Sequence, residues 1–196
     1  MTNNAPLISV CIPSFNRPEF IGDLLDTIIT QSCEDFEIVI CEDNSPKTIE
    51  IEEVVKKYFN MRHNIDVRFI RNPETLGYDG NFRKLIDISK GQYCVFMGDD
   101  DLMCENALLR ISQVIENNKP GVIIRSWATA NRETKELREV FRYFDGDRLF
   151  SSGEDSIVTL FRRSVAIAGF TVNREKALKY SSDRFDGTLL YQLYLT

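Results

Sequence analysis

Histidine is almost absent from this chain of 196 residues, and the single one, His63, lies in a polar segment expected to form a turn. One imidazole does not support a histidine-based catalytic triad or a cluster of histidine metal ligands. A GxGxxG sequence is also missing after every predicted strand, which argues against a dinucleotide-dependent oxidoreductase. The formal net charge of −6 argues against nucleic acid and anionic membrane as broad electrostatic partners.

Long apolar runs and a regular cysteine pattern are missing too. No stretch approaches the ~20 apolar residues that a membrane-spanning helix requires. Residues 1–6 are short and polar, so we expect a disordered N-terminus rather than a secretory signal. The five cysteines form an odd set without CxxC spacing. Three of them (Cys11, Cys41 and Cys94) lie in apolar runs, so we expect free thiols in a reducing, cytoplasmic environment and no zinc site.

Short apolar runs alternate with segments of helical periodicity through the first 119 residues. In residues 18–29 the apolar side chains recur at the spacing that gives a helix one broad apolar face. Strands are predicted at residues 7–12, 36–41, 67–70 and 93–97, and helices at 18–29, 49–58, 82–89 and 102–117, with a turn at 77–80. This alternation is typical of a single α/β domain with a Rossmann-like, mostly parallel sheet sandwiched by helices.

Three consecutive carboxylates, Asp99, Asp100 and Asp101, follow the apolar strand at residues 93–97. Adjacent anions repel one another, and a divalent cation among them would offset that repulsion. Mg²⁺ in particular takes one or two carboxylates together with substrate phosphates. The triplet therefore predicts a Mn²⁺ or Mg²⁺ site that bridges the protein and a phosphorylated ligand. The alternative is an acidic start of the helix at 102–117, with the aspartates facing the positive end of its dipole.

Polar residues gather at the predicted strand ends. Parallel connections are right-handed, so the carboxyl ends of the strands share one edge of the sheet. Ligands of such sheets bind outside that edge, where the strand order reverses. The residues collected there are Pro13, Ser14, Phe15, Asn16, Arg17, Glu42, Asp43, Asn72, Asp99, Asp100 and Asp101. This segregation favours metal and phosphate binding over the helix-start alternative.

The pattern changes after residue 120. Residues 122–125 are strand-like, 132–139 form a charged turn or hairpin, and 142–152 form a loop. Helices are predicted at 157–161 and 189–195, and residues 165–172 form an apolar segment around Gly169. Because the chain finishes without a helix stop signal, we expect the natural protein to be longer.

Together these residues resemble the family-2 glycosyltransferases with the GT-A fold, strongly over residues 7–117 and weakly over 168–195. The family's opening Pro-x-Tyr-Asn appears as Pro13-Ser14-Phe15-Asn16, with phenylalanine in place of tyrosine. Its apolar strand followed by Asp-Asp-Gly-Ser ends here in Glu42-Asp43-Asn44-Ser45. Its Asp-x-Asp metal element appears as Asp99-Asp100-Asp101, where Gly98 stands at the usual first position. Each motif alone is weak, but their order and spacing are specific.

The resemblance implies a nucleotide-sugar-binding half at residues 7–119 and an acceptor-side half at 120–196. Asp43 would hydrogen-bond the base with Glu42 nearby, and residues 13–17 would form the wall beside base and ribose. Asp99 would face the ribose or a metal water, and Asp100 or Asp101 would hold the metal on the diphosphate. Further residues implied to reach the nucleotide are Asn72, Asn81 and Arg83. A solvated helix face explains Arg83 equally well.

The implied reaction transfers a sugar, with inversion, from a nucleoside-diphosphate donor to a hydroxyl of a glycan or lipid-linked acceptor. Such enzymes often build cell-surface polysaccharides, so a cytoplasmic protein with peripheral association at the inner membrane face is implied. A general base must take the acceptor proton. The resemblance implies a carboxylate before a late helix, which points to Asp186 and then Asp183, with Glu154 and Asp155 as earlier alternatives. Each aspartate could instead be a helix cap.

Two other classes of protein would share the sheet. A sugar-phosphate nucleotidylyltransferase would carry a glycine-rich, basic loop after the first strand, but residues 14–17 contain no glycine. A non-catalytic nucleotide-sugar-binding subunit is favoured if neither late aspartate approaches the metal site.

Overall fold

The structure, a computed structural model, describes residues 5–61, 64–131, 133–134, 136–142, 144–151, 155, 158–159 and 166–196. His63, Glu154 and most of the helix predicted at 157–161 lie outside these residues. The strands of the main sheet are β1 (Ile8–Ser14), β2 (Phe36–Glu42), β3 (Val67–Arg71), β4 (Tyr93–Phe96), β5 (Val122–Ile124) and β8 (Phe170–Asn173). The helices are α1 (Pro18–Ile29), α2 (Thr48–Lys56), α3 (Gly77–Ile88), α4 (Ala107–Asn118), α6 (Arg174–Lys179) and α7 (Tyr191–Leu195), and a 3-10 turn, η2 (Ile167–Gly169), precedes β8.

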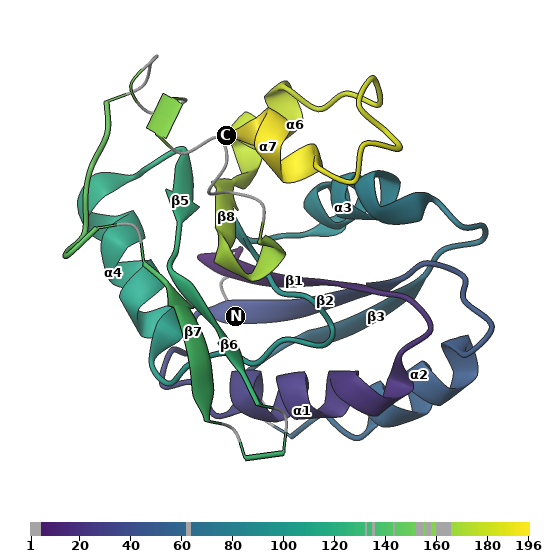
Figure 1. The fold of residues 1–196 in the computed structure, drawn as a ribbon. Coiled ribbons are helices and arrows are strands. Elements are labelled where there is room, and N and C mark those ends of the chain that lie inside the picture. Colours follow the sequence, from purple (N-terminus) through teal and green to yellow (C-terminus); the bar gives the residue numbers. More distant parts are fainter. Residues whose placement is uncertain are drawn as a thin grey trace.

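The sheet has six strands in the order β3-β2-β1-β4-β8-β5 (Figure 1). The first four strands run parallel, and β8 is antiparallel to both of its neighbours, β4 and β5. The predicted mostly parallel sheet is therefore confirmed. The sequence marked the segment around β8 only as apolar, because this strand of four residues is too short to show an alternating pattern.

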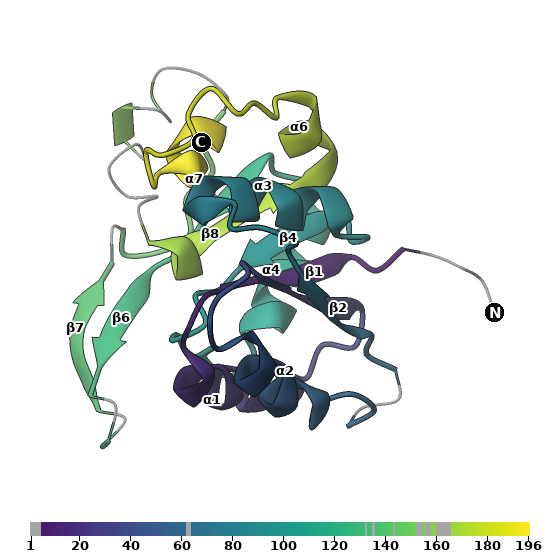
Figure 2. The same ribbon diagram turned by 90° about the vertical axis from the view of Figure 1, so that its right-hand side faces the viewer.

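Helices cover both faces of the sheet (Figure 2). Successive side chains of a strand point to opposite faces, and on β1 the buried Val10 and Ile12 pack with α1, α2 and α4. Cys11 lies between them in the chain and belongs to the second apolar cluster, which includes α3, α6 and α7. Both faces are apolar because both are covered, which explains the continuous apolar runs in the sequence.

The largest differences from the predicted helices are at the starts of α3 and α4. Helix α4 begins at Ala107, after Asn106 in the left-handed conformation (φ 58°), and not near residue 102. The aspartate triplet is therefore not the first turn of a helix, and that alternative is wrong. Residues 77–80, expected as a turn, form the first turn of α3 instead.

A two-stranded hairpin of β6 (Trp127–Ala130) and β7 (Leu137–Phe141) extends away from the main sheet (Figure 2). This confirms the hairpin expected near residues 132–139. The rings of Trp127 and Phe141 stack at a centroid distance of 3.8 Å, at the end of the hairpin nearest the sheet. Two strands alone are marginally stable, so this stack contributes to their pairing.

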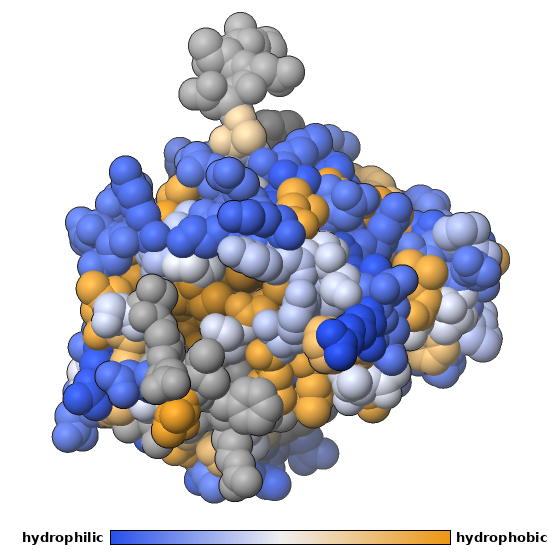
Figure 3. Space-filling model, turned by 90° about the horizontal axis from the view of Figure 1, so that it is seen from above, coloured by the Kyte–Doolittle hydropathy of each residue, from blue (hydrophilic) through white to orange (hydrophobic). Residues whose placement is uncertain are grey.

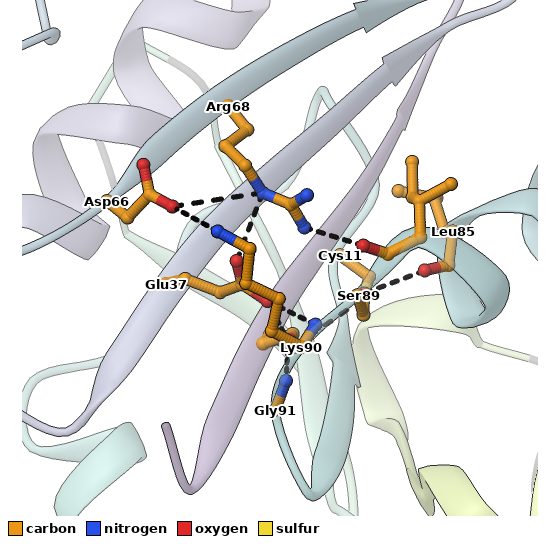
Figure 4. A network of polar contacts seen from close by, with 10 residues as sticks. Cys11, Glu37, Asp66, Arg68, Leu85, Ser89, Lys90 and Gly91 are labelled. Atoms are coloured by element: carbon orange, nitrogen blue, oxygen red, sulfur yellow. Dashed lines mark hydrogen bonds and ion pairs between the residues drawn. The ribbon is translucent and has the colours of Figure 1, made fainter. Parts of the chain in front are cut away.

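A buried polar network fixes the edge of the sheet where the parallel strands begin (Figure 4). The carboxylate of Glu37, near the start of β2, accepts hydrogen bonds from Ser9 Oγ (2.7 Å) and the Lys90 backbone N–H (2.6 Å). Arg68 pairs with its other oxygen (Nε–Oε2 3.1 Å) and donates to the Ile88 carbonyl (2.7 Å). The network joins β1, β2, β3 and the segment before β4, so it sets the register of the strands whose opposite ends form the candidate site.

Candidate functional site at the carboxyl edge

The strand order reverses beside β1. From β1 the chain moves outward through β2 and β3, then returns to place β4 on the other side of β1. The carboxyl ends of β1 and β4 therefore flank the point at which an open α/β sheet binds ligands. The residues that follow these two strands include Phe15, Arg17 and the aspartate triplet.

Arg17 connects the two strand ends. Its Nη2 lies 2.6 Å from Asp99 Oδ1, and its Nη1 lies 2.6 Å from Asp100 Oδ2. The backbone N–H of Phe15 donates to Asp99 Oδ2 at 3.3 Å. The sequence predicted that these residues share one edge, and the structure brings them into direct contact. The side chain of Phe15 is exposed beside them.

Asp99 is a buried carboxylate in an ion pair. Its side chain has no exposed surface, and burial raises the pKa of Asp99 from 3.8 to about 6. The positive charge of Arg17 and the Phe15 N–H act in the opposite direction. The partner of Asp99 Oδ1 is the Arg17 guanidinium group, at 2.6 Å. The Ser14 hydroxyl also lowers the pKa of Asp99.

Asp100 and Asp101 bind different groups. Asp100 pairs with Arg17, and its side chain is 44% exposed. Asp101 Oδ2 accepts the Gly98 N–H at 2.9 Å, and burial raises the pKa of Asp101. No three His, Cys, Asp or Glu side chains in the described part of the chain are placed to hold a metal ion by themselves. Mg²⁺ and Mn²⁺ still suit this donor set, because Mg²⁺ sites commonly take one or two carboxylates and complete the shell with water and phosphate oxygens.

Asp43 lies at the end of β2 and is almost fully bonded within the protein. Its Oδ1 accepts hydrogen bonds from Asn72 Nδ2 (2.9 Å) and the Leu76 N–H (2.8 Å). Its Oδ2 accepts the Gly77 N–H at 2.8 Å. Asp43 therefore fixes the start of α3. A carboxylate offers about four acceptor positions, so Oδ2 can accept one more N–H.

Three other residues predicted on the nucleotide side also make protein hydrogen bonds. Glu42 accepts from the Ser45 N–H (2.9 Å) and Thr48 Oγ1 (2.6 Å), which fixes the turn into α2. Asn72 donates to Asn81 Oδ1 at 3.2 Å, and Asn81 donates to the Cys41 carbonyl at 2.9 Å. All three side chains are buried, so they shape the wall of the edge from behind. Pro13 and Ser14 end β1 on the same edge.

Arg83 and Asp186, which the sequence analysis considered separately, form an ion pair. Arg83 Nε donates to Asp186 Oδ1 at 3.2 Å, and its Nη2 donates to Asp186 Oδ2. Both groups are partly exposed. The pair joins α3 to the turn that contains Asp183, whose side chain is exposed. Neither late aspartate caps α7, because the carboxylate that accepts the Tyr191 N–H belongs to Asp79.

The sequence does not predict the roles of Asp79 and Arg125. Asp79 lies in the first turn of α3 but caps α7, which is distant in sequence. Arg125, just beyond β5, donates to the carbonyls of Phe96 (3.3 Å) and Ala168 (2.5 Å). Burial lowers the pKa of Arg125 to about 10, and the negative charge of Asp101 opposes this shift. Arg125 therefore supports the end of β4 beneath the triplet. A charged residue that ends an apolar run was its only sequence signal.

An apolar groove of about 1080 Å³ lies elsewhere on the surface. Figure 3 shows a hollow on the surface, and the residues visible inside it are mainly apolar. Its walls come from α4, β5, α6, α7 and residues 144–151, and none of the predicted site residues lines it. Among the described helices, none has the length and apolar character needed to cross a membrane.

Comparison with known proteins identifies the family. Residues 9–183 match the family described as Glycosyl transferase family 2. The chain belongs to this family, and its fold is the GT-A fold.

Two curated relatives illustrate the match. The chain is 32% identical over 111 residues to the abequosyltransferase RfbV of Salmonella typhimurium. This match covers 57% of this chain and 33% of RfbV. It is 28% identical over 123 residues to a PGL/p-HBAD biosynthesis glycosyltransferase of Mycobacterium bovis. That match covers 61% of this chain and 46% of the mycobacterial protein. The matched segments thus amount to between a third and a half of the length of these two relatives.

Solved structures share the fold at low sequence identity. S. aureus TarS 1-349 in complex with UDP superposes with a TM-score of 0.70 and 19% identity, over 96% of this chain and 53% of that one. The mannosyltransferase PcManGT from Pyrobaculum calidifontis, in complex with GDP-Man and Mn²⁺, gives a TM-score of 0.67 and 13% identity. The superposition covers 98% of this chain and 51% of PcManGT.

Proposed function

We propose that this chain binds a nucleoside-diphosphate sugar across the carboxyl ends of β1 and β4 and transfers the sugar, with inversion, to an acceptor hydroxyl. The observation that carries the proposal is the contact of Arg17 with Asp99 and Asp100 at the reversal of strand order. A guanidinium group and two carboxylates at this reversal suit a diphosphate and its counter-ion, which supports the proposal. The UDP and GDP-Man complexes of the two structural relatives support the donor class.

Asp100 and Asp101 are the proposed holders of Mn²⁺ or Mg²⁺. When bound, such a metal supplies a Lewis acid that neutralises charge on the departing diphosphate. The Mn²⁺ in the PcManGT complex and the partial exposure of Asp100 support this assignment. Asp99 would remain in the protein shell, since its side chain has no exposed surface.

The proposed base-binding wall consists of residues 13–17 and the end of β2. Asp43 Oδ2 would accept an N–H of the base at its remaining acceptor position. Glu42, Asn72 and Asn81 would act indirectly, by fixing the backbone around Asp43. The exposed ring of Phe15 offers an apolar surface for the base or the ribose.

Asp186 is the proposed general base. In the transfer, its carboxylate takes the proton of the acceptor hydroxyl, the hydroxyl oxygen forms a bond to the anomeric carbon, and the bond from that carbon to the diphosphate oxygen breaks. Such a base contributes a rate factor of ~10²–10⁴. The acceptor is proposed to be a glycan or a lipid-linked glycan in cell-surface polysaccharide synthesis, with peripheral association at the inner membrane face.

A second candidate function is donor binding without transfer. Both carboxylate oxygens of Asp186 accept from Arg83, and this ion pair fixes the direction of the carboxylate. If the acceptor hydroxyl cannot approach an acceptor position that Arg83 leaves open, the chain binds the nucleotide sugar and lacks a working base.

The variant Asp186→Asn separates the two functions. Donor affinity, measured by calorimetry, should stay within about twofold of the parent, while transfer to an acceptor falls by about 10²–10⁴-fold. Asp183→Asn, three residues earlier in the same turn, is the matched control and should keep transfer. If Asp186→Asn transfers at the parental rate, Asp186 is not the base. If the parent binds donor but transfers to no acceptor, the binding-only function is correct.

A further inference from the structure

The backbone around Arg17 directs its side chain across the site. Asn16 is in the left-handed conformation (φ 61°), and Pro18 is the first residue of α1. Arg17 therefore stands at the amino end of α1, where the helix dipole disfavours a positive charge. Its side chain caps no backbone group of the helix. The two aspartates beyond β4 supply the charge that offsets this unfavourable position.

The two ion pairs of Arg17 differ in strength. Asp99 has no exposed side-chain surface, so its pair lies in a medium of low dielectric constant. Asp100 is 44% exposed and Arg17 is 45% exposed, so their pair is screened by water. Exposed pairs of this kind contribute little to stability. Asp100 is therefore the partner that Arg17 can release most easily.

Other groups can replace each partner. A divalent cation prefers carboxylate oxygens and would repel the guanidinium group from Asp100. The fork of N–H donors on an arginine matches two oxygens of a phosphate. A metal and a diphosphate that arrive together would therefore offer each member of the Arg17–Asp100 pair a new partner.

We infer that Arg17 is a displaceable counter-ion of the aspartate triplet. It pairs with Asp99 and Asp100 before the donor binds, and it gives up Asp100 to the divalent cation and turns to the diphosphate as the donor enters. This inference rests on the proposed function, because it assumes that metal and diphosphate meet at this edge. It makes Arg17 a competitor of the metal in the absence of donor and a ligand of the diphosphate in its presence.

These two roles predict opposite effects of one substitution. In Arg17→Gln, Mn²⁺ added alone should bind about fivefold more tightly, the upper range for loss of one exposed competing pair. The nucleoside diphosphate, added with saturating Mn²⁺, should bind about ten- to a hundredfold more weakly, because a charged hydrogen-bond donor is lost. An arginine that only supports the fold would not strengthen metal binding.

The experiment is isothermal titration of Mn²⁺, and then of UDP or GDP in saturating Mn²⁺, into the parent and three variants. Arg17→Lys keeps the charge and removes the fork, so its Mn²⁺ affinity should stay near the parental value while diphosphate binding weakens. Arg110→Gln is the charge-matched control, since Arg110 pairs with Asp147 on an exposed surface elsewhere (3.4 Å). Circular dichroism verifies that each variant is folded.

Tighter Mn²⁺ binding in Arg17→Gln, and not in Arg110→Gln, supports the inference. Equal or weaker Mn²⁺ binding in Arg17→Gln overturns it and leaves the proposed function intact if the parent still requires Mn²⁺ for UDP or GDP. If neither the parent nor Arg17→Gln binds Mn²⁺ while the parent binds UDP or GDP, the inference and the proposed metal role are both wrong. If Arg17→Gln does not fold, the test rests on Arg17→Lys. A parental affinity of Arg17→Lys for UDP or GDP then contradicts the role of Arg17 as a ligand of the diphosphate.

Discussion

Asp79, in the first turn of α3, accepts the backbone N–H of Tyr191 at 3.0 Å, and the two residues are 112 positions apart in the chain. The other oxygen of Asp79 accepts the Leu189 N–H at 2.9 Å. Through these bonds α3 caps the last helix and fixes the segment that follows Asp186. The Arg83–Asp186 pair joins the same two parts of the chain, so α3 connects the proposed nucleotide side of the site to the proposed acceptor side.

Asp79→Ala should destabilise the protein, because the buried Tyr191 N–H and the part-buried Leu189 N–H lose their acceptor. The expected loss is about 1–3 kcal/mol in the free energy of unfolding. Chemical denaturation of the parent and the variant measures it. Asp87→Ala, at an exposed position of the same helix, is the control. Equal stability of the two variants would show that the Asp79 bonds contribute nothing.

Asp43→Ala should weaken nucleoside-diphosphate binding by about 1–3 kcal/mol, the scale of a lost hydrogen bond to a charged group. Part of this loss will be indirect, since Asp43 also holds the Leu76 and Gly77 N–H groups. Calorimetry gives the affinity, and a thermal melt gives the stability. Asp66→Ala, which removes a partner of Lys90 at the opposite edge, should leave the affinity unchanged. An unaltered dissociation constant in Asp43→Ala would remove Asp43 from the site.

The buried carboxyl of Asp99 should make stability depend on pH. Because the pKa of Asp99 is about 6 in the folded protein and 3.8 ordinarily, the folded state binds more protons between these values. The stabilisation that comes from the protonated Asp99 carboxyl is fully present below pH 3.8 and is lost as the pH rises through 6. The total loss is about 2–3 kcal/mol. In EDTA, the stability of Asp99→Asn relative to the parent should therefore increase from pH 4 to pH 7. A constant difference would contradict the shifted pKa.

One cysteine should react much faster than the others with a thiol reagent. Cys104 is exposed and the other four are buried. Burial raises the pKa of Cys41 to about 12 and that of Cys11 well above 9, so few thiolates form at pH 8. We expect one rapid equivalent in the native parent and none in Cys104→Ser. Rapid labelling of all five thiols would contradict the buried sheet.

The first half of the fold was predictable because its signals are local. The strands near Val10, Ile38 and Val95 are covered on both faces and read as continuous apolar runs. Strand β8 was not predictable, since its short antiparallel insertion between β4 and β5 depends on partners distant in sequence. The start of α4 was misplaced because the left-handed Asn106 delays the helix after the triplet.

The candidate site was predictable at the level of the sheet edge. The parallel topology alone places the residues after β1 next to those after β4. The pairing of Arg17 with Asp99 and Asp100 follows from side-chain positions that topology does not specify. Topology also does not specify the pairing of Arg83 with Asp186, which are 103 positions apart. The sequence suggests different roles for these two residues. The residues between them carry no pattern that indicates the contact.

The central claim is that a nucleoside diphosphate binds at the β1–β4 edge together with a metal held by Asp100 and Asp101. Calorimetry of the parent and of Asp100→Asn with UDP and GDP, in Mn²⁺ and in EDTA, tests it most directly. The account predicts that one nucleotide binds the parent in Mn²⁺, and that EDTA or Asp100→Asn weakens this binding at least tenfold, about the energy of one charged hydrogen bond. Equal affinity of the parent in Mn²⁺ and EDTA, unchanged by Asp100→Asn, would contradict it.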